Sequence, residues 1–137
     1  IDLSIVSKNV GIELLYSMHR KKTGALLQCA VMLGAFLDPE LSNEDEAILG
    51  SFSEDIGLAY QVQDDVLDVT TSGAVLGKRQ NSDADKDKPT FLSTLGMDES
   101  VRVYQSLYQR ASESIFQLSV DEAPLRSLTE KLMSRMF

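Results

Sequence analysis

The 137-residue chain carries 13 lysine and arginine side chains against 21 aspartate and glutamate side chains, for a formal net charge of −8. This acidity argues against a nucleic acid as partner, because phosphate backbones bind to positively charged surfaces. The hydrophobic content of 43% fits one globular domain and excludes a chain disordered by composition. No apolar run reaches the roughly 18 residues of a membrane span and no signal-peptide pattern occurs, so we expect a cytoplasmic protein.

The first predicted element is a helix that begins near the start of the chain. The chain opens at Ile1 without a methionine and enters a helical pattern almost at once, which suggests a piece of a longer protein. Apolar residues at helical spacing predict one apolar stripe on this helix, formed by Val10, Leu14, Leu15 and Met18.

The stretch His19-Arg20-Lys21-Lys22-Thr23-Gly24 allows two interpretations. Cations suit a helix C-terminus, where they complement the helix dipole. However, no loop composition follows Gly24, and an apolar helix continues over residues 25–36. Thr23-Gly24 is then a kink, since glycine loosens a helix and threonine can turn its hydroxyl on the backbone. A kink frees carbonyls that can face a ligand.

Two further expectations concern the segments around this apolar helix. Cys29, the only cysteine, is predicted to be a small buried hydrophobe, and no disulfide can form within the chain. Beyond the helix, Ser42 and Asp45 loosely fit a capping box at the start of the next helix. The acidic run in this polar loop is predicted to be solvated.

The central predicted helix runs from about Asp45 to Val69 and is apolar on nearly all sides, which is typical of a buried helix. It contains Gly57, which either leaves room for a bulky substrate or permits close helix packing; the sequence leaves both open.

An acidic stripe interrupts this apolar helix. At about 100° per residue, four side chains fall within an arc of roughly 100°, namely Gln61, Asp64, Asp65 and Asp68. Burying unpaired carboxylates costs several kcal/mol or raises their pKa until they neutralise. A compensating cation is therefore expected, and carboxylate oxygens suit Mg²⁺. The alternative is a solvated acidic helix face.

Residues 70–90 show no periodicity of their own. A loop of about 20 residues is unusual in a compact domain and is commonly functional. The alternation of Asp83, Asp85 and Asp87 does not predict calcium binding, because the sixth and twelfth EF-hand positions hold Lys88 and Thr94.

Two amphipathic helices close the chain, from about Asp98 to Leu118 and from about Pro124 to Met136. Their predicted core residues are Val101, Tyr104, Leu107, Tyr108, Ile115 and Leu118. With no strand pattern anywhere, the sequence predicts an all-α bundle of antiparallel helices.

An ordered set of motifs resembles the C-terminal half of the short-chain polyprenyl diphosphate synthases, most of all the bacterial farnesyl diphosphate synthases. The motifs are Lys22-Thr23-Gly24, Gln61-Val62-Gln63-Asp64-Asp65-Val66-Leu67-Asp68-Val69, Gly77-Lys78 and Lys88-Pro89-Thr90. The resemblance implies an isoprenoid-synthase bundle of which residues 1–137 are the C-terminal part of a single domain. It also implies a homodimer, and a first aspartate-rich motif upstream of Ile1.

The chemistry implied by this resemblance is head-to-tail prenyl transfer. An allylic diphosphate, dimethylallyl or geranyl, ionises by releasing diphosphate, its cation alkylates isopentenyl diphosphate, and a proton is then lost. Farnesyl diphosphate is the expected product. The resemblance implies that Asp64, Asp65 and Asp68 hold Mg²⁺ against the allylic diphosphate. The implied diphosphate ligands are Lys22, Lys78 and Lys88, and the implied catalytic groups facing the allylic cation are Thr23, Gln61 and the carbonyl of Lys22.

Three alternatives remain open. A longer-chain geranylgeranyl diphosphate synthase would share these motifs, and a non-catalytic helical partner subunit would not need all of them. A terpene cyclase customarily mixes Asn, Ser or Thr and Glu in its second metal motif, whereas Asp64, Asp65 and Asp68 are all aspartate. Because the first aspartate-rich motif is missing, the chain by itself is expected to be inactive.

Overall fold

The computed structural model describes residues 11–74 and 89–135. These residues form helices and connecting turns without any strand, which confirms the all-α prediction. None of the described helices is both long and apolar enough to cross a bilayer. The elements are α1 (Ile12–His19), the π-helical segment η2 (Arg20–Gly24), α2 (Ala25–Ala35), α3 (Asn43–Ala74), α5 (Phe91–Leu95), α6 (Met97–Ile115) and α7 (Ala123–Met133).

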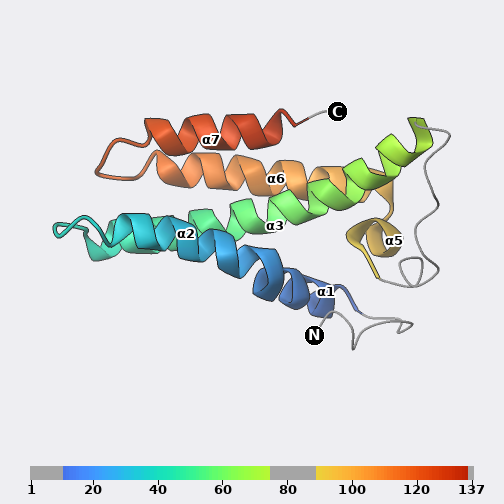
Figure 1. Ribbon diagram of the computed structural model, residues 1–137, viewed down its shortest axis with the longest axis horizontal. Helices are drawn as coiled ribbons and strands as arrows, with labels where there is room; N and C mark the ends of the chain where they lie inside the picture. Colours follow the sequence, from blue (N-terminus) through green and yellow to red (C-terminus); the bar gives the residue numbers. More distant parts are fainter. Residues whose placement is uncertain (1–10, 75–88, 136–137) are drawn as a thin grey trace.

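Helix α3 is the centre of the bundle, as its apolar composition predicts. Figure 1 shows α3 running along the molecule with α2 on one side and α6 on the other, and with α7 lying beside α6. Its side chains Phe52 and Val62 are fully buried, together with Tyr108 and Ile115 of α6. Of the six predicted core residues in the closing helices, Leu107, Tyr108 and Ile115 are buried, while Tyr104 and Leu118 pack partly buried against the core.

The largest departures from the predicted elements flank the segment after α3. The helix continues past Val69 to Ala74, and the Thr70 hydroxyl donates to the backbone oxygens of Val66 and Leu67 at 3.2 and 3.0 Å. Thr70 is therefore helical rather than the start of a loop. No element was predicted for residues 91–95, but helix α5 lies there and begins with a capping box between Thr90 and Ser93.

Helix α2 contradicts the burial prediction for Cys29. It buries none of its residues against the described chain, and Cys29 is exposed rather than buried. Leu26 is 72% exposed and Leu33 is 64% exposed. The prediction rested on the apolar residues around Cys29, whereas among the described elements α2 packs mainly on α3 and η2. In α1, likewise, Leu15 and Met18 are buried but Leu14 is 46% exposed.

Asp45 is buried, although the acidic run around it was predicted to be solvated. The Ser42 hydroxyl accepts from the Asp45 N–H at 3.0 Å and donates to Asp45 Oδ2 at 2.8 Å, a modified form of the expected cap. The Ser119 N–H donates to Asp45 Oδ1 at 2.9 Å. Hydrogen bonds from the Ser119 side chain, the Ser119 backbone and Ser42 lower the pKa of Asp45. This carboxylate thus joins the start of α3 to the segment after α6.

Candidate functional site

The predicted carboxylate stripe lies on α3, and its three members have different surroundings. Asp64 and Asp65 are partly buried and Asp68 is exposed. Asp65 Oδ2 accepts a hydrogen bond of 2.9 Å from the backbone N–H of Phe91, the first residue of α5. Asp64 Oδ1 lies 3.2 Å from Nη2 of Arg135, beyond the end of α7. Asp65 thus binds the first turn of α5, while Asp64 pairs with Arg135.

The stripe is electrostatically unfavourable without a cation. Desolvation by burial raises the pKa of Asp65, and the charges of Asp64 and Asp68 raise it further; the Phe91 hydrogen bond lowers it, as does His19 in its protonated form. Burial and the charge of Asp64 raise the pKa of Asp68. Clustered carboxylates of this kind are the donors that Mg²⁺ takes. Across residues 11–74 and 89–135, however, no three acidic, histidine or cysteine side chains converge closely enough to hold a metal ion by themselves.

The predicted kink at Thr23-Gly24 is a π-helical segment. Helices α1, η2 and α2 follow one another without a loop, which supports the continuous-helix interpretation of this stretch. Within η2, Lys22 is exposed, Thr23 is partly buried and Gly24 is buried. A π-helical turn departs from the usual helical hydrogen-bond pattern and is frequent at functional sites.

Gly57 brings α3 against this π-helical segment. A Cβ atom added at Gly57 would lie 2.8 Å from the Cα atom of Gly24. Of the two roles that the sequence left open for Gly57, this contact supports close helix packing. It also places the helix turn of Gln61 beside the segment that carries Lys22 and Thr23.

Gln61 has a partner that sequence reasoning did not single out as a site residue. Nδ1 of His19 lies 3.2 Å from Oε1 of Gln61. His19 ends α1, is buried, and has its ring 5.0 Å from the ring of Phe91. The available signal was a lone histidine three residues before Lys22, which in the sequence looked like part of a basic helix end.

Two more residues near the stripe were missed, Gln63 and Arg135. Gln63 is buried, accepts from the Tyr108 hydroxyl at 2.8 Å, and donates to the backbone oxygens of Met133 and Arg135 at 3.5 and 3.4 Å. These bonds fix the end of α7, so that the Arg135 guanidinium lies 4.0 Å from the ring centre of Tyr60 as well as beside Asp64. Burial raises the pKa of Tyr108 to about 12, which keeps this hydroxyl a donor.

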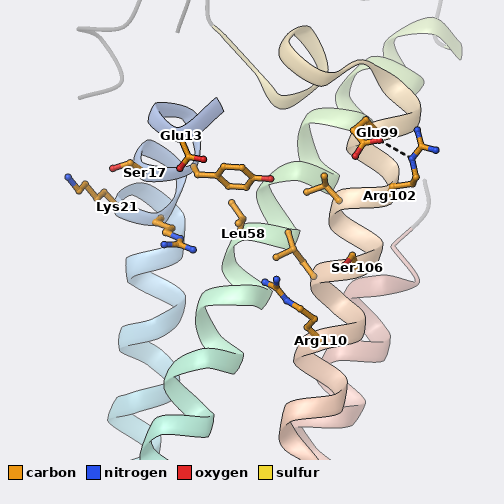
Figure 2. Close-up of a pocket in the computed structure, with 12 residues that line it drawn as sticks. Glu13, Ser17, Lys21, Leu58, Glu99, Arg102, Ser106 and Arg110 are labelled. Carbon is orange, nitrogen blue, oxygen red and sulfur yellow. Dashed lines mark hydrogen bonds and ion pairs between the residues drawn. The ribbon is translucent and has the colours of Figure 1, made fainter. Parts of the chain in front are cut away.

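A pocket of about 760 Å³ lies away from the stripe, between α1, η2, α3 and α6. Figure 2 shows Glu13, Ser17 and Lys21 on one wall, with Glu99, Arg102 and Arg110 on the other. Arg102 pairs with Glu99, and Arg110 pairs with Asp55 just outside the pocket. None of the predicted site residues lines this pocket. Lys78 and Lys88 lie outside the described residues, so their predicted roles stay predictions.

The bundle has the helical fold of the polyprenyl synthetases. It superposes with a TM-score of 0.76 on an FPP/GFPP synthase from Zymomonas mobilis, at 26% identity, covering 96% of this chain and 42% of that one. A geranyltransferase from Helicobacter pylori shows the same fold, with a TM-score of 0.79 at 22% identity over 98% of this chain and 42% of that one.

The polyprenyl synthetase family matches residues 1–121, and the chain belongs to this family. It is 38% identical to farnesyl diphosphate synthase of Escherichia coli, covering 98% of this chain and 46% of that protein. It is 35% identical to geranylgeranyl diphosphate synthase of Cyanophora paradoxa, covering 98% of this chain and 45% of that protein. The chain therefore spans less than half the length of these curated relatives.

Proposed function

We propose that the protein containing this chain is a prenyltransferase that joins an allylic diphosphate to isopentenyl diphosphate, with farnesyl diphosphate as product. The observation that carries the proposal is the stripe of Asp64, Asp65 and Asp68, two of them with raised pKa values, on a helix packed against the π-helical segment of Lys22 and Thr23. Membership of the polyprenyl synthetase family supports it.

Mg²⁺ is the proposed cofactor, and when bound it would supply positive charge to the departing diphosphate. Asp64 would be its main ligand, since this side chain is 49% exposed and pairs, among the described residues, with the partly buried Arg135. Asp68, also exposed, would add an oxygen one turn further along the helix. Asp65 contributes through its charge, because one of its oxygens already accepts from Phe91.

The π-helical segment and Gln61 are assigned to the allylic cation. The Thr23 hydroxyl, the Gln61 amide oxygen and the Lys22 carbonyl would direct oxygen dipoles toward the cation, stabilising positive charge without capturing it. The Lys22 ammonium would bind the allylic diphosphate, together with Lys78 and Lys88 as the resemblance implies. A homodimer is likewise proposed from the resemblance.

The decisive experiment incubates the full-length protein with dimethylallyl diphosphate, isopentenyl diphosphate and Mg²⁺, and identifies the product. Farnesyl diphosphate that disappears when EDTA is added is the expected result. Geranylgeranyl diphosphate as the main product would support the longer-chain alternative, which relatives such as the Cyanophora enzyme keep open. A folded full-length protein without any prenyl transfer would overturn the proposal in favour of a non-catalytic partner subunit.

A further inference from the structure

His19 is the single histidine of the chain, and it lies at the junction of α1 with the π-helical segment. Its side chain is only 6% exposed. One ring nitrogen, Nδ1, lies 3.2 Å from Gln61 Oε1, while the other, Nε2, is buried and has no hydrogen-bond partner among residues 11–74 and 89–135. A buried polar atom without a partner carries a free-energy cost. An apolar side chain would fill the same space without that cost, so packing alone does not account for a histidine here.

The contact with Gln61 defines the chemical state of the ring. With Oε1 of Gln61 facing the ring, this hydrogen bond needs a proton on Nδ1 of His19, because an amide oxygen can only accept. In the neutral ring, Nε2 is then an acceptor. Oε1 has two lone pairs, and the bond from His19 uses one of them. The amide plane of Gln61 is thereby fixed while its second lone pair stays available.

Further contacts hold His19 itself in place. The ring of Phe91 lies 5.0 Å from the ring of His19, and Tyr16 packs on the same phenyl ring at 5.1 Å. The backbone N–H of Phe91 is in turn bound to Asp65. A chain of contacts thus runs from the carboxylate stripe through α5 to His19, and from there to Gln61.

We propose that His19 is a positioning residue that fixes the Gln61 amide for its role at the allylic cation. This inference rests on the proposed prenyl transfer. The contribution of His19 is orientation: without the Nδ1–H bond, the Gln61 amide can rotate about its last torsion angle, and the oxygen dipole loses its fixed direction.

Two substitutions in the full-length protein separate this role from packing. In His19→Asn, the side-chain amide lies near the position of Nδ1 and can still bond Gln61. In His19→Gln, the amide extends to the position of Nε2 and leaves Gln61 without its partner. We expect kcat to fall up to about 100-fold in His19→Gln, with KM for isopentenyl diphosphate nearly unchanged, and only a few-fold in His19→Asn.

A double variant and a control complete the test. In a Gln61→Leu background, the further change His19→Gln should cost little additional activity, because the bond is already lost. Ser53→Ala removes the hydrogen bond of another buried side chain on α3 and should leave kcat unchanged. The positioning role would be overturned if His19→Asn and His19→Gln lost kcat equally and in proportion to their loss of thermal stability. It would also be overturned if the losses of kcat from the two substitutions added up in the double variant.

An inactive wild-type protein would refute the proposed function rather than this contact. In that case, nitrogen-resolved NMR of the imidazole, assigned with the His19→Asn variant, tests the bond directly. A proton on Nδ1 is expected, and a neutral ring with its proton on Nε2 would overturn the arrangement.

Discussion

Replacing Gly57 by alanine tests the close packing of α3 on the π-helical segment. The new Cβ atom would lie 2.8 Å from Gly24 Cα, whereas carbon atoms pack at about 3.5–4.0 Å. The obstructing atom belongs to the backbone, so a rotamer change cannot relieve the overlap and the two segments must move apart. Overpacking of this kind costs about 1–3 kcal/mol.

Gly50→Ala is the matched control. Gly50 lies in the same helix, and a Cβ atom added there has nothing within 4 Å. Both variants gain the same helix propensity, about 1 kcal/mol, so the difference between them isolates the packing cost. We expect Gly57→Ala to be about 1–3 kcal/mol less stable than Gly50→Ala in denaturant unfolding of the full-length protein. Its kcat should fall as well, because Lys22 and Thr23 move with η2.

The other reading of Gly57, space for a substrate, predicts a different pattern. A Gly57→Ala protein as stable as Gly50→Ala, with a raised KM for the allylic diphosphate, would refute the packing argument and support the substrate-space interpretation.

Three other predictions address charged groups. Asp64→Asn should remove most Mg²⁺-dependent turnover without lowering the thermal midpoint, since it relieves repulsion with Asp65 and Asp68; an unchanged kcat at saturating Mg²⁺ would contradict the metal assignment. Arg135→Gln should tighten Mg²⁺ binding by up to about fivefold in titration calorimetry, because partly exposed ion pairs contribute up to about 1 kcal/mol. Weaker Mg²⁺ binding by this variant would show that Arg135 does not compete with the metal for Asp64. Folding lowers the pKa of Asp45. Its carboxylate therefore stabilises the folded protein fully at pH values above 3.8, the usual pKa, and this contribution is lost as the pH falls through the lowered pKa. The free energies of unfolding of wild type and Asp45→Asn should therefore converge in acid. A difference between them that stays constant from neutral pH to acid would show that the Asp45 charge does not stabilise the fold.

The bundle could be predicted because its signals are local. An apolar pattern around all sides of residues 45–69 is enough to identify a central helix, and α3 has this role. The helix end could not be predicted in the same way. Thr70 favours loops by composition, but its hydroxyl bonds to the preceding turn and the helix continues.

The predicted burial of Cys29 on α2 was wrong for a related reason. Composition reports how apolar a helix is and not which neighbours cover it. Cys29 was therefore predicted to be buried, although the described chain leaves it exposed.

The site was predictable as a stripe but not as a set of contacts. Helical spacing alone places Gln61 and the three aspartates on one face. Their partners come from distant parts of the sequence: His19 lies 42 residues before Gln61, and Arg135 lies 71 residues after Asp64. A pattern read along the chain has no access to such pairs, and the buried histidine was accordingly overlooked.

Asp65 and Asp64 are adjacent and chemically identical, yet their loss should have different consequences for folding. Removing Asp65 by alanine leaves the backbone N–H of Phe91 without its acceptor, at the first turn of a five-residue helix. An unsatisfied donor of this kind costs about 1–3 kcal/mol, so Asp65→Ala should lower the free energy of unfolding by that amount. Asp65→Asn keeps an acceptor oxygen and removes a charge that burial disfavours, so it should be nearly neutral for stability. Asp64→Ala, which loses only a partly exposed ion pair, is the control and should stay within about 1 kcal/mol of wild type. If Asp65→Ala proved no less stable than Asp64→Ala, the hydrogen bond to Phe91 would not hold α5, and the contact chain from the stripe to His19 would lose its first link.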